Sequence, residues 1–197
     1  MTDYAALYES AFACIGDRTP LGQDCGVLCG KACCHGSDGQ GMRLFPHESS
    51  PLPRTATTDG APMVACSGMC DRATRPLACR IFPFFPYLHA DGHISAEIDV
   101  RGLRLCPLVS SCRRVQFDRS FRRAVRAAGR ILAQDDEIRA FLRESSAEID
   151  TFRAFTGFAD TPSARENQSG TGKNGGTEYG NRKKIFDSPA RPASGRA

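Results

Sequence analysis

The sequence predicts a small, mostly helical α+β protein with an irregular cysteine-rich centre and one short β-hairpin. Apolar residues recur at helical spacing near the N-terminus and again beyond residue 117, and one stretch between them alternates apolar and polar residues. Residues 24–112 hold nine of the ten cysteines and eight of the twelve prolines. Prolines at that density interrupt long regular elements. A chain of 197 residues has room for one ordinary domain with attachments.

The first predicted element is a helix over residues 3–15, because apolar side chains form one stripe there and Thr2 or Asp3 is suited to be its N-cap. Pro20 and Gly22 end this segment. The centre is expected to be irregular apart from short elements: a helical or looped cysteine segment over 25–34, a brief strand near 42–45, a surface loop over 48–62, and a half-buried strand over 94–100 that the Asp91-Gly92 turn pairs with 86–89.

Two amphipathic helical segments follow, with stripes over 117–132 and 138–152. The first carries many arginines and the second many carboxylates, so we expect adjacent antiparallel helices that neutralise each other. A phosphate- or nucleic-acid-binding face is the less favoured alternative for the arginines, because no aromatic residues interleave with them as in proteins that bind single strands. The predicted segments are therefore an N-terminal helix packed on the body (1–23), a cysteine-rich metal-binding domain (24–112), a C-terminal helical pair (113–157) and a disordered tail (158–197).

Charge and hydropathy argue against a membrane-spanning or secreted protein and give little support for nucleic-acid binding. Residues 161–197 carry seven Lys/Arg against three Asp/Glu, which accounts for the whole net charge of +4 and leaves the body neutral. The longest apolar stretch, 81–88, contains two prolines and is too short to span a membrane. The first residues lack the basic and apolar regions of a signal peptide. We therefore expect a cytoplasmic protein whose cysteines are metal ligands or redox groups rather than disulfides.

The cysteines fall into two sets. In the first, Cys25, Cys29 and Cys33 recur every four residues, which on a helix places three thiols along one face. Cys34 adjoins Cys33, and because neighbouring side chains point in different directions, the two can serve different metals, or one can bind metal while the other packs. Glycines between these cysteines leave room for backbone N–H groups near thiolate sulfurs.

The second set repeats the three-residue spacer in Cys66 and Cys70, followed by Cys79 and Cys106. Eight cysteines are enough for two four-thiolate sites, or for one cluster and one smaller site. The arginines that flank Cys79 are candidates to balance thiolate charge. The predicted metal ligands are Cys25, Cys29, Cys33, Cys34, Cys66, Cys70, Cys79 and Cys106.

The pattern Cys70-x4-Arg75-Pro76-x2-Cys79-Arg80-x2-Pro83, after a segment ending in Cys33-Cys34, resembles the CxxCxxCC zinc- or iron-chelating domain family. Cys106-Pro107 falls where that family commonly has a Cys-Pro pair. The resemblance covers residues 24–110, and the first block departs from the family in its three-residue spacing. It implies metal binding by cysteine thiolates, with zinc or iron, including an iron–sulfur cluster, as the cofactor.

The physiological role stays open between a structural or interaction module and an iron–sulfur-dependent redox or methylase-like enzyme related to flagellin lysine methylase, a member of the family. No glycine-rich nucleotide loop follows a strand. The four histidines are not needed as ligands. Glu48 is a candidate carboxylate ligand or general base, but a capping or loop role is the one expected of it. Cys14 is expected to be a core residue. For Cys112 three roles stay open: an additional ligand, a ligand in place of Cys106, or a packing residue.

Overall fold

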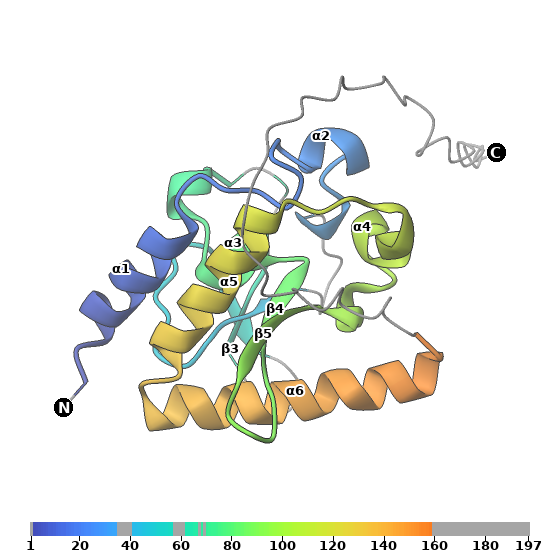
Figure 1. Ribbon diagram of the computed structural model, residues 1–197. Coiled ribbons are helices and arrows are strands. Elements are labelled where there is room, and N and C mark those ends of the chain that lie inside the picture. Colours follow the sequence, from blue (N-terminus) through green and yellow to red (C-terminus); the bar gives the residue numbers. More distant parts are fainter. Residues whose placement is uncertain (1, 35–40, 57–61, 67, 69, 159–197) are drawn as a thin grey trace, which may run out of the picture. The chain divides into compact units, whose positions relative to one another are not determined.

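The computed structural model describes residues 2–34, 41–56, 62–66, 68 and 70–158. These residues belong to one compact unit, Met1–Thr161. The expected disordered tail lies outside the described residues apart from Phe158. The fold is the small α+β type that the sequence predicts, with long helices and a short antiparallel hairpin (Figure 1).

The hairpin of β4 (Phe84–Leu88) and β5 (Ile94–Ile98) lies at the centre of the core. The strands are antiparallel, and Phe84 pairs with Ile98 at their open end. The turn closes through Gly92, which has a φ of +84° and donates its N–H to the carbonyl of His89 at 3.0 Å. The apolar residues of β5 are buried while Ser95 and Glu97 are half-buried, as period-two alternation predicts.

Two capped helices pack against this hairpin, and a third capped helix packs on one of them. Helix α1 (Tyr4–Ile15) begins at Asp3, whose carboxylate accepts a hydrogen bond from the Ala6 N–H at 3.1 Å. Helices α5 (Arg119–Leu132) and α6 (Asp136–Thr156) begin in the same way, at Asp118 and Asp135. Such caps satisfy N–H groups that have no partner within the helix. Helix α1 lies beside α5, and both α5 and α6 pack against β4 (Figure 1).

Gly129 allows α5 to approach the hairpin closely. A Cβ at this position would lie 2.4 Å from Cβ of Pro86 and 3.1 Å from a methyl carbon of Ile94. Gly129→Ala is therefore expected to lower the free energy of unfolding by about 1–3 kcal/mol, because the overpacking outweighs a gain of about 1 kcal/mol in helix propensity. Urea denaturation measures this difference, and a variant with a raised midpoint would contradict the close approach.

A second, three-stranded sheet has the order β1-β3-β2 and consists of β1 (Met42–Arg43), β2 (Arg54–Ala56) and β3 (Pro62–Val64). The strand expected near 42–45 is confirmed as β1. The expected surface loop over 48–62 is wrong where β2 forms, because these three residues pair antiparallel with β3. A strand this short carries too few residues for an alternating pattern to be visible in the sequence.

Several charged residues of α6 form ion pairs with elements other than α5. Glu148 of α6 contacts Arg43 of β1 at 3.0 Å and Arg101 at 2.9 Å. Arg153 of α6 contacts Glu97 of β5 at 3.4 Å. The acidic face of α6 therefore meets cations from the cysteine-rich centre. On α5, the guanidinium of Arg122 lies 5.6 Å from the ring centroid of Phe84.

Short helical turns make up the rest of the described regular structure. None of the helices in the described ranges has the length and apolar character needed to cross a membrane. The short helices, some of them of the 3-10 type, are α2 (Gly26–Cys29), η1 (Ala32–Cys34), η2 (Arg72–Thr74), α3 (Leu77–Ile81), η3 (Val100–Gly102), α4 (Pro107–Ser110) and η4 (Cys112–Arg114).

Candidate metal centre

The first cysteine set lies on two short turns rather than on one continuous helix. Helix α2 ends at Gly30, and Gly30 and Lys31 have φ angles of +59° and +57° that redirect the chain into η1. Glycine adopts this conformation without steric cost. The expected single helical face for the three regularly spaced thiols is therefore interrupted, and the Cys33-Cys34 doublet lies on the second turn.

The second set comes from four places in the chain. Cys66 follows β3, Cys70 precedes η2, Cys79 lies within α3, and Cys106 is the residue before α4. Asp71 holds η2 in place through a 3.0 Å hydrogen bond that its carboxylate accepts from the Ala73 N–H. Local turns thus direct side chains from distant parts of the sequence toward one region.

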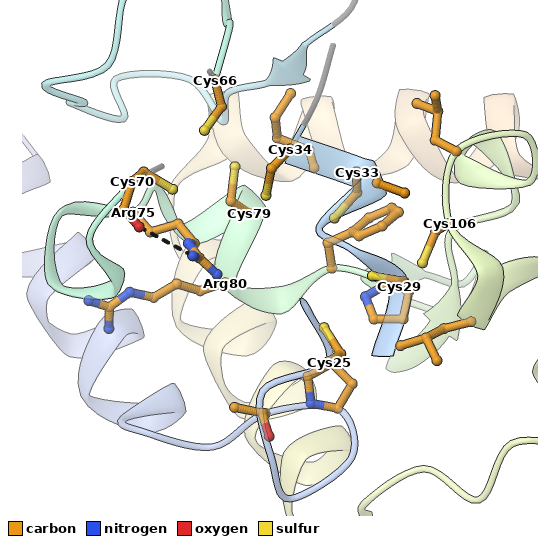
Figure 2. Close-up of a pocket in the computed structure, with 18 of the residues that line it drawn as sticks. Cys25, Cys29, Cys33, Cys34, Cys66, Cys70, Arg75, Cys79, Arg80 and Cys106 are labelled. Carbon is orange, nitrogen blue, oxygen red and sulfur yellow. Dashed lines mark hydrogen bonds between the residues drawn. The ribbon is translucent and has the colours of Figure 1, made fainter. Parts of the chain in front are cut away.

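All eight predicted ligand cysteines line one open pocket (Figure 2). Cys106 is buried and the other seven are half-buried. None of the ten cysteines, all of which lie in the described ranges, is joined in a disulfide. Cys14 and Cys112 do not line this pocket, although both pack against the hydrophobic core. The eight cysteines that line the pocket are therefore the eight that the sequence analysis selects, and the two that it sets aside lie outside the pocket lining. For Cys112 the structure supports a packing role.

Within the pocket the thiols form two groups of four (Figure 2). The first thiol group consists of Cys25, Cys29, Cys33 and Cys106, whose electrostatic interactions link Cys106 with the other three. The second thiol group consists of Cys34, Cys66, Cys70 and Cys79, in which Cys70 interacts with Cys66 and Cys79 and so does Cys34. The doublet places one thiol in each group, and the side-chain hydrogen bond between Cys33 and Cys34 links the two groups.

The pKa values of several pocket thiols are raised, which favours their neutral form. Burial, together with the nearby thiols of Cys29 and Cys106, raises the pKa of Cys25 to about 11. The side-chain hydrogen bond with Cys34 and burial raise the pKa of Cys33. Burial also raises the pKa of Cys79. Several thiolates in one pocket repel each other, and a bound cation removes that penalty by displacing the protons.

Arg75 and Arg80 are two of the three arginines that line the pocket, the third being Arg72. The Arg75 guanidinium donates to the carbonyl oxygen of Cys70 at 3.4 Å (Figure 2). Burial lowers its pKa, but the hydrogen bond to the Cys70 side chain and the charges of neighbouring cysteines outweigh this, so the pKa of Arg75 is raised overall. Arg80 donates to the carbonyl of Ala73 at 3.0 Å and lies 4.9 Å from the ring centroid of Phe12. Arg75 is thus placed to balance thiolate charge, while Arg80 is anchored at the pocket edge.

Glu48 caps α3, in agreement with the expected capping role. Its side chain is 3% exposed, and its carboxylate accepts the N–H of Phe45 at 3.1 Å and, in a short hydrogen bond, the N–H of Leu77. Burial raises the pKa of Glu48 to about 7. Because Leu77 begins α3 and Cys79 lies two residues further on, this buried carboxylate positions one member of the second thiol group.

The histidines lie elsewhere where they are described. His47 stacks on Tyr4 at a ring separation of 3.8 Å, and His89 and His93 lie at the turn of the hairpin. His35 lies outside the described residues. The apolar wall of the pocket was missed in the sequence, and it includes Phe82 and Leu105. Leu105 could have been suspected from the sequence, because it directly precedes the predicted ligand Cys106. It is 38% exposed, which is unusual for a large apolar residue.

The donor set fits a thiophilic metal, although as placed no three His, Cys, Asp or Glu side chains in the described ranges converge closely enough to hold an ion. Cysteine thiolates, which the eight residues of this pocket can supply, are the ligands that zinc and iron–sulfur clusters use, whereas magnesium and calcium prefer oxygen. In comparisons with known proteins, no family model matches this chain, and no curated protein and no solved structure is significantly similar to it.

Proposed function

We propose that the protein binds zinc or iron, including an iron–sulfur cluster, through the cysteine thiolates of the pocket. One observation carries the proposal: the eight cysteines chosen from sequence spacing all line a single pocket, and the two excluded ones do not. Buried cysteines that served only as small apolar residues would be spread through the core. A cytoplasmic location fits this proposal, because free thiols persist in a reducing compartment.

The two thiol groups support two four-ligand sites. Four sulfur donors complete a tetrahedral zinc site, and four also hold one iron–sulfur cluster. Binding requires deprotonation, so the raised pKa values of Cys25 and Cys33 make metal uptake favour higher pH. Arg75 offsets part of the negative charge that four thiolates leave around a divalent ion.

Anaerobic purification followed by metal analysis and a visible absorption spectrum tests the proposal. We expect zinc or iron bound to the purified protein. A brown sample with broad visible absorption identifies an iron–sulfur cluster, and a colourless one containing zinc identifies the structural form. Fully folded, metal-free protein that takes up neither metal on reconstitution contradicts the proposal, because a centre rich in proline and glycine has little else to organise it.

A second candidate is an iron–sulfur-dependent enzyme of the redox or methylase type. The observation that favours it is a further pocket with aromatic walls, which shares Cys33 with the thiol pocket and so leaves room for an organic substrate beside the first thiol group. S-adenosylmethionine should then raise the melting temperature of the iron-loaded protein. An unchanged melting temperature at saturating ligand leaves the methylase version without support.

A further inference from the structure

Helix α5 carries a line of arginines on the side that faces away from the core. Its 14 residues include five arginines and no acidic residue. At about 100° of rotation per residue, four of these arginines fall within an arc of about 60°, and the buried residues of the helix lie around the opposite side. The four, which we call the arginine stripe, are Arg119, Arg123, Arg126 and Arg130. The stripe extends for about 16 Å along the helix axis.

Three members of the stripe are accessible to an external ligand. Arg119, Arg123 and Arg130 are exposed, and none of them forms an ion pair with a carboxylate in the ranges that the structure describes. Asp118 is the acid nearest to them in the sequence. A hydrogen bond from Ser120, and to a smaller extent the charge of Arg123, lower the pKa of Asp118, but its carboxylate is used to cap the helix.

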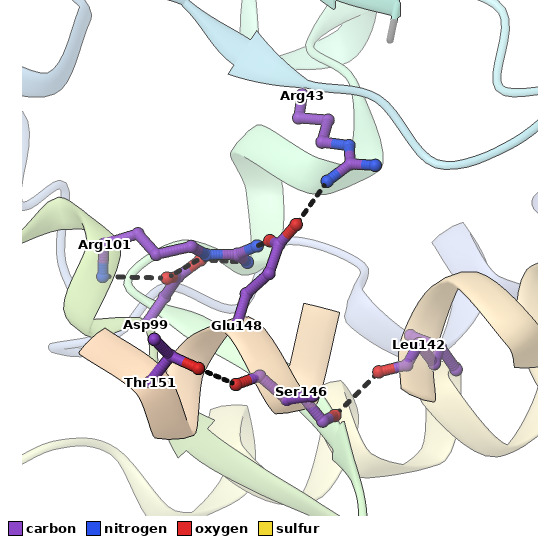
Figure 3. Close-up of polar contacts among 8 residues, drawn as sticks. Arg43, Asp99, Arg101, Leu142, Ser146, Glu148 and Thr151 are labelled. Atoms are coloured by element: carbon purple, nitrogen blue, oxygen red, sulfur yellow. Dashed lines mark hydrogen bonds and ion pairs between the residues drawn. The ribbon is translucent and has the colours of Figure 1, made fainter. Parts of the chain in front are cut away.

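The carboxylates of α6 are the expected partners of these arginines, but the described contacts of two of them lead to other elements. Glu148 lies between the guanidinium groups of Arg43 and Arg101, at 3.0 and 2.9 Å (Figure 3). Asp150 accepts a hydrogen bond from the Tyr87 hydroxyl at 2.6 Å. The negative charge of these two residues is therefore directed away from the stripe.

The stripe brings like charges close together. Arg119 and Arg123 are four positions apart, as are Arg126 and Arg130, and residues at this spacing are neighbours on a helix surface. Like charges at such positions destabilise a helix. A line of anions placed along the stripe would remove this repulsion. It would also gain the charge-assisted, bidentate contacts that arginine makes with phosphate groups.

The composition of the stripe selects among the possible anionic partners. Its members are all arginines, and the large apolar residues of α5 are buried or half-buried. Single-stranded nucleic acid is bound by stacking on aromatic side chains, and an interfacial membrane helix inserts large apolar ones. Protein interfaces have an apolar core inside a polar rim. The stripe offers none of these features, whereas the phosphates of a nucleic-acid duplex require only regularly placed cations.

We propose that the arginine stripe of α5 binds the phosphate backbone of double-stranded DNA. Phosphate contacts carry no base information, so this binding is independent of sequence. The stripe offers donors only and has no acceptor for the 2′-hydroxyl donors that distinguish RNA. None of the α5 residues lines the thiol pocket, so the inference goes beyond metal binding and does not depend on it.

Fluorescence anisotropy of a labelled DNA duplex of about two helical turns, titrated with the full chain, measures this binding. At physiological salt the Kd should be about 1–100 µM. The logarithm of the binding constant should fall linearly with the logarithm of the salt concentration, by about 0.9 for each phosphate contacted. Two duplexes of different sequence should bind within about threefold of each other.

A triple variant locates the binding on α5. Combining Arg119→Gln, Arg123→Gln and Arg130→Gln should weaken duplex binding at least about tenfold and lower the salt slope by about 3. Lysine at the same three positions keeps the charge and should retain the slope. The glutamine variant should melt no lower than the unchanged protein, because it removes like-charge pairs. A lowered melting temperature would instead assign these arginines to the stability of the fold and overturn the proposal.

A matched control removes the same charge elsewhere. Arg104→Gln, Arg139→Gln and Arg143→Gln combined change three exposed arginines outside α5 and should alter the Kd by less than about threefold. Every variant keeps the basic residues of 161–197, so the difference between the two triple variants reports on α5.

The proposal would be overturned if the α5 glutamine variant binds the duplex as tightly as the unchanged protein, or if the control variant loses as much affinity. Tighter binding of single-stranded DNA, of duplex RNA or of phosphatidylserine vesicles than of the DNA duplex, by about tenfold or more, would also overturn it, because each would assign the stripe to another partner.

Discussion

Cys79→Ser is expected to remove metal from the second thiol group and to leave the first group loaded, so that metal per chain falls by about half. Serine does not supply a thiolate at neutral pH, and a four-ligand site tolerates the loss of one ligand poorly. Cys106→Ser should remove metal from the first group instead. Elemental analysis of anaerobically purified variants measures both losses, and circular dichroism reports whether each variant is folded.

Matched controls and a double variant sharpen this result. Cys14→Ser changes a half-buried cysteine outside the pocket and should retain all the metal. Combining the Cys79 and Cys106 substitutions should remove nearly all of it. If Cys79→Ser retains the full metal content, or if Cys14→Ser loses as much as Cys79→Ser, the assignment of ligands is wrong.

Glu48→Ala is expected to lower the free energy of unfolding by about 2–5 kcal/mol, the largest stability effect that we predict for a single residue outside the thiol groups. The substitution leaves the buried N–H groups of Phe45 and Leu77 without their acceptor, at about 1–3 kcal/mol each. Glu144→Ala, an exposed position on α6, serves as the control and should change stability by less than about 0.5 kcal/mol. Equal midpoints for the two variants in urea denaturation would contradict the capping role.

Glu48 also predicts a pH dependence. Burial raises its pKa from the usual 4.5 to about 7 in the folded protein, so between these values the folded state binds more protons than the unfolded state. Its contribution is therefore fully present below pH 4.5 and is lost as the pH rises through about 7, by roughly 3 kcal/mol. Glu48→Gln, which does not titrate, should flatten this part of the stability profile. A Glu48→Gln profile as steep as that of the unchanged protein would assign the slope to other groups.

The long elements could be predicted because their patterns are local. Apolar spacing identifies α1, α5 and α6, and aspartates directly before them act as caps. Alternation and the Asp91-Gly92 turn identify the hairpin. The pairing of α6 could not be predicted in the same way, because Glu148 and Arg43 are 105 positions apart and meet only through the packing of α6 beside β1. Charge content indicated that ion pairs form, but not between which elements.

The candidate site was predictable in composition but not in arrangement. Clustering and spacing selected the eight cysteines that line the pocket. Their division into two groups falls between the adjacent Cys33 and Cys34 on η1, and it depends on the separate placement of Cys106 directly before α4. These are tertiary features without a local pattern. The aromatic pocket was missed for the same reason, since its phenylalanines appear in the sequence only as ordinary core residues.

X-ray absorption at the metal edge tests the central claim most directly, because it reports which atoms surround the metal. For anaerobically purified protein, the account predicts a first shell of sulfur alone, with about four sulfurs per metal, at about 2.3 Å if the metal is zinc. Cys14→Ser should give the same spectrum. A first shell made mainly of nitrogen or oxygen would contradict the account, because histidines or carboxylates, rather than the pocket thiols, would then hold the metal.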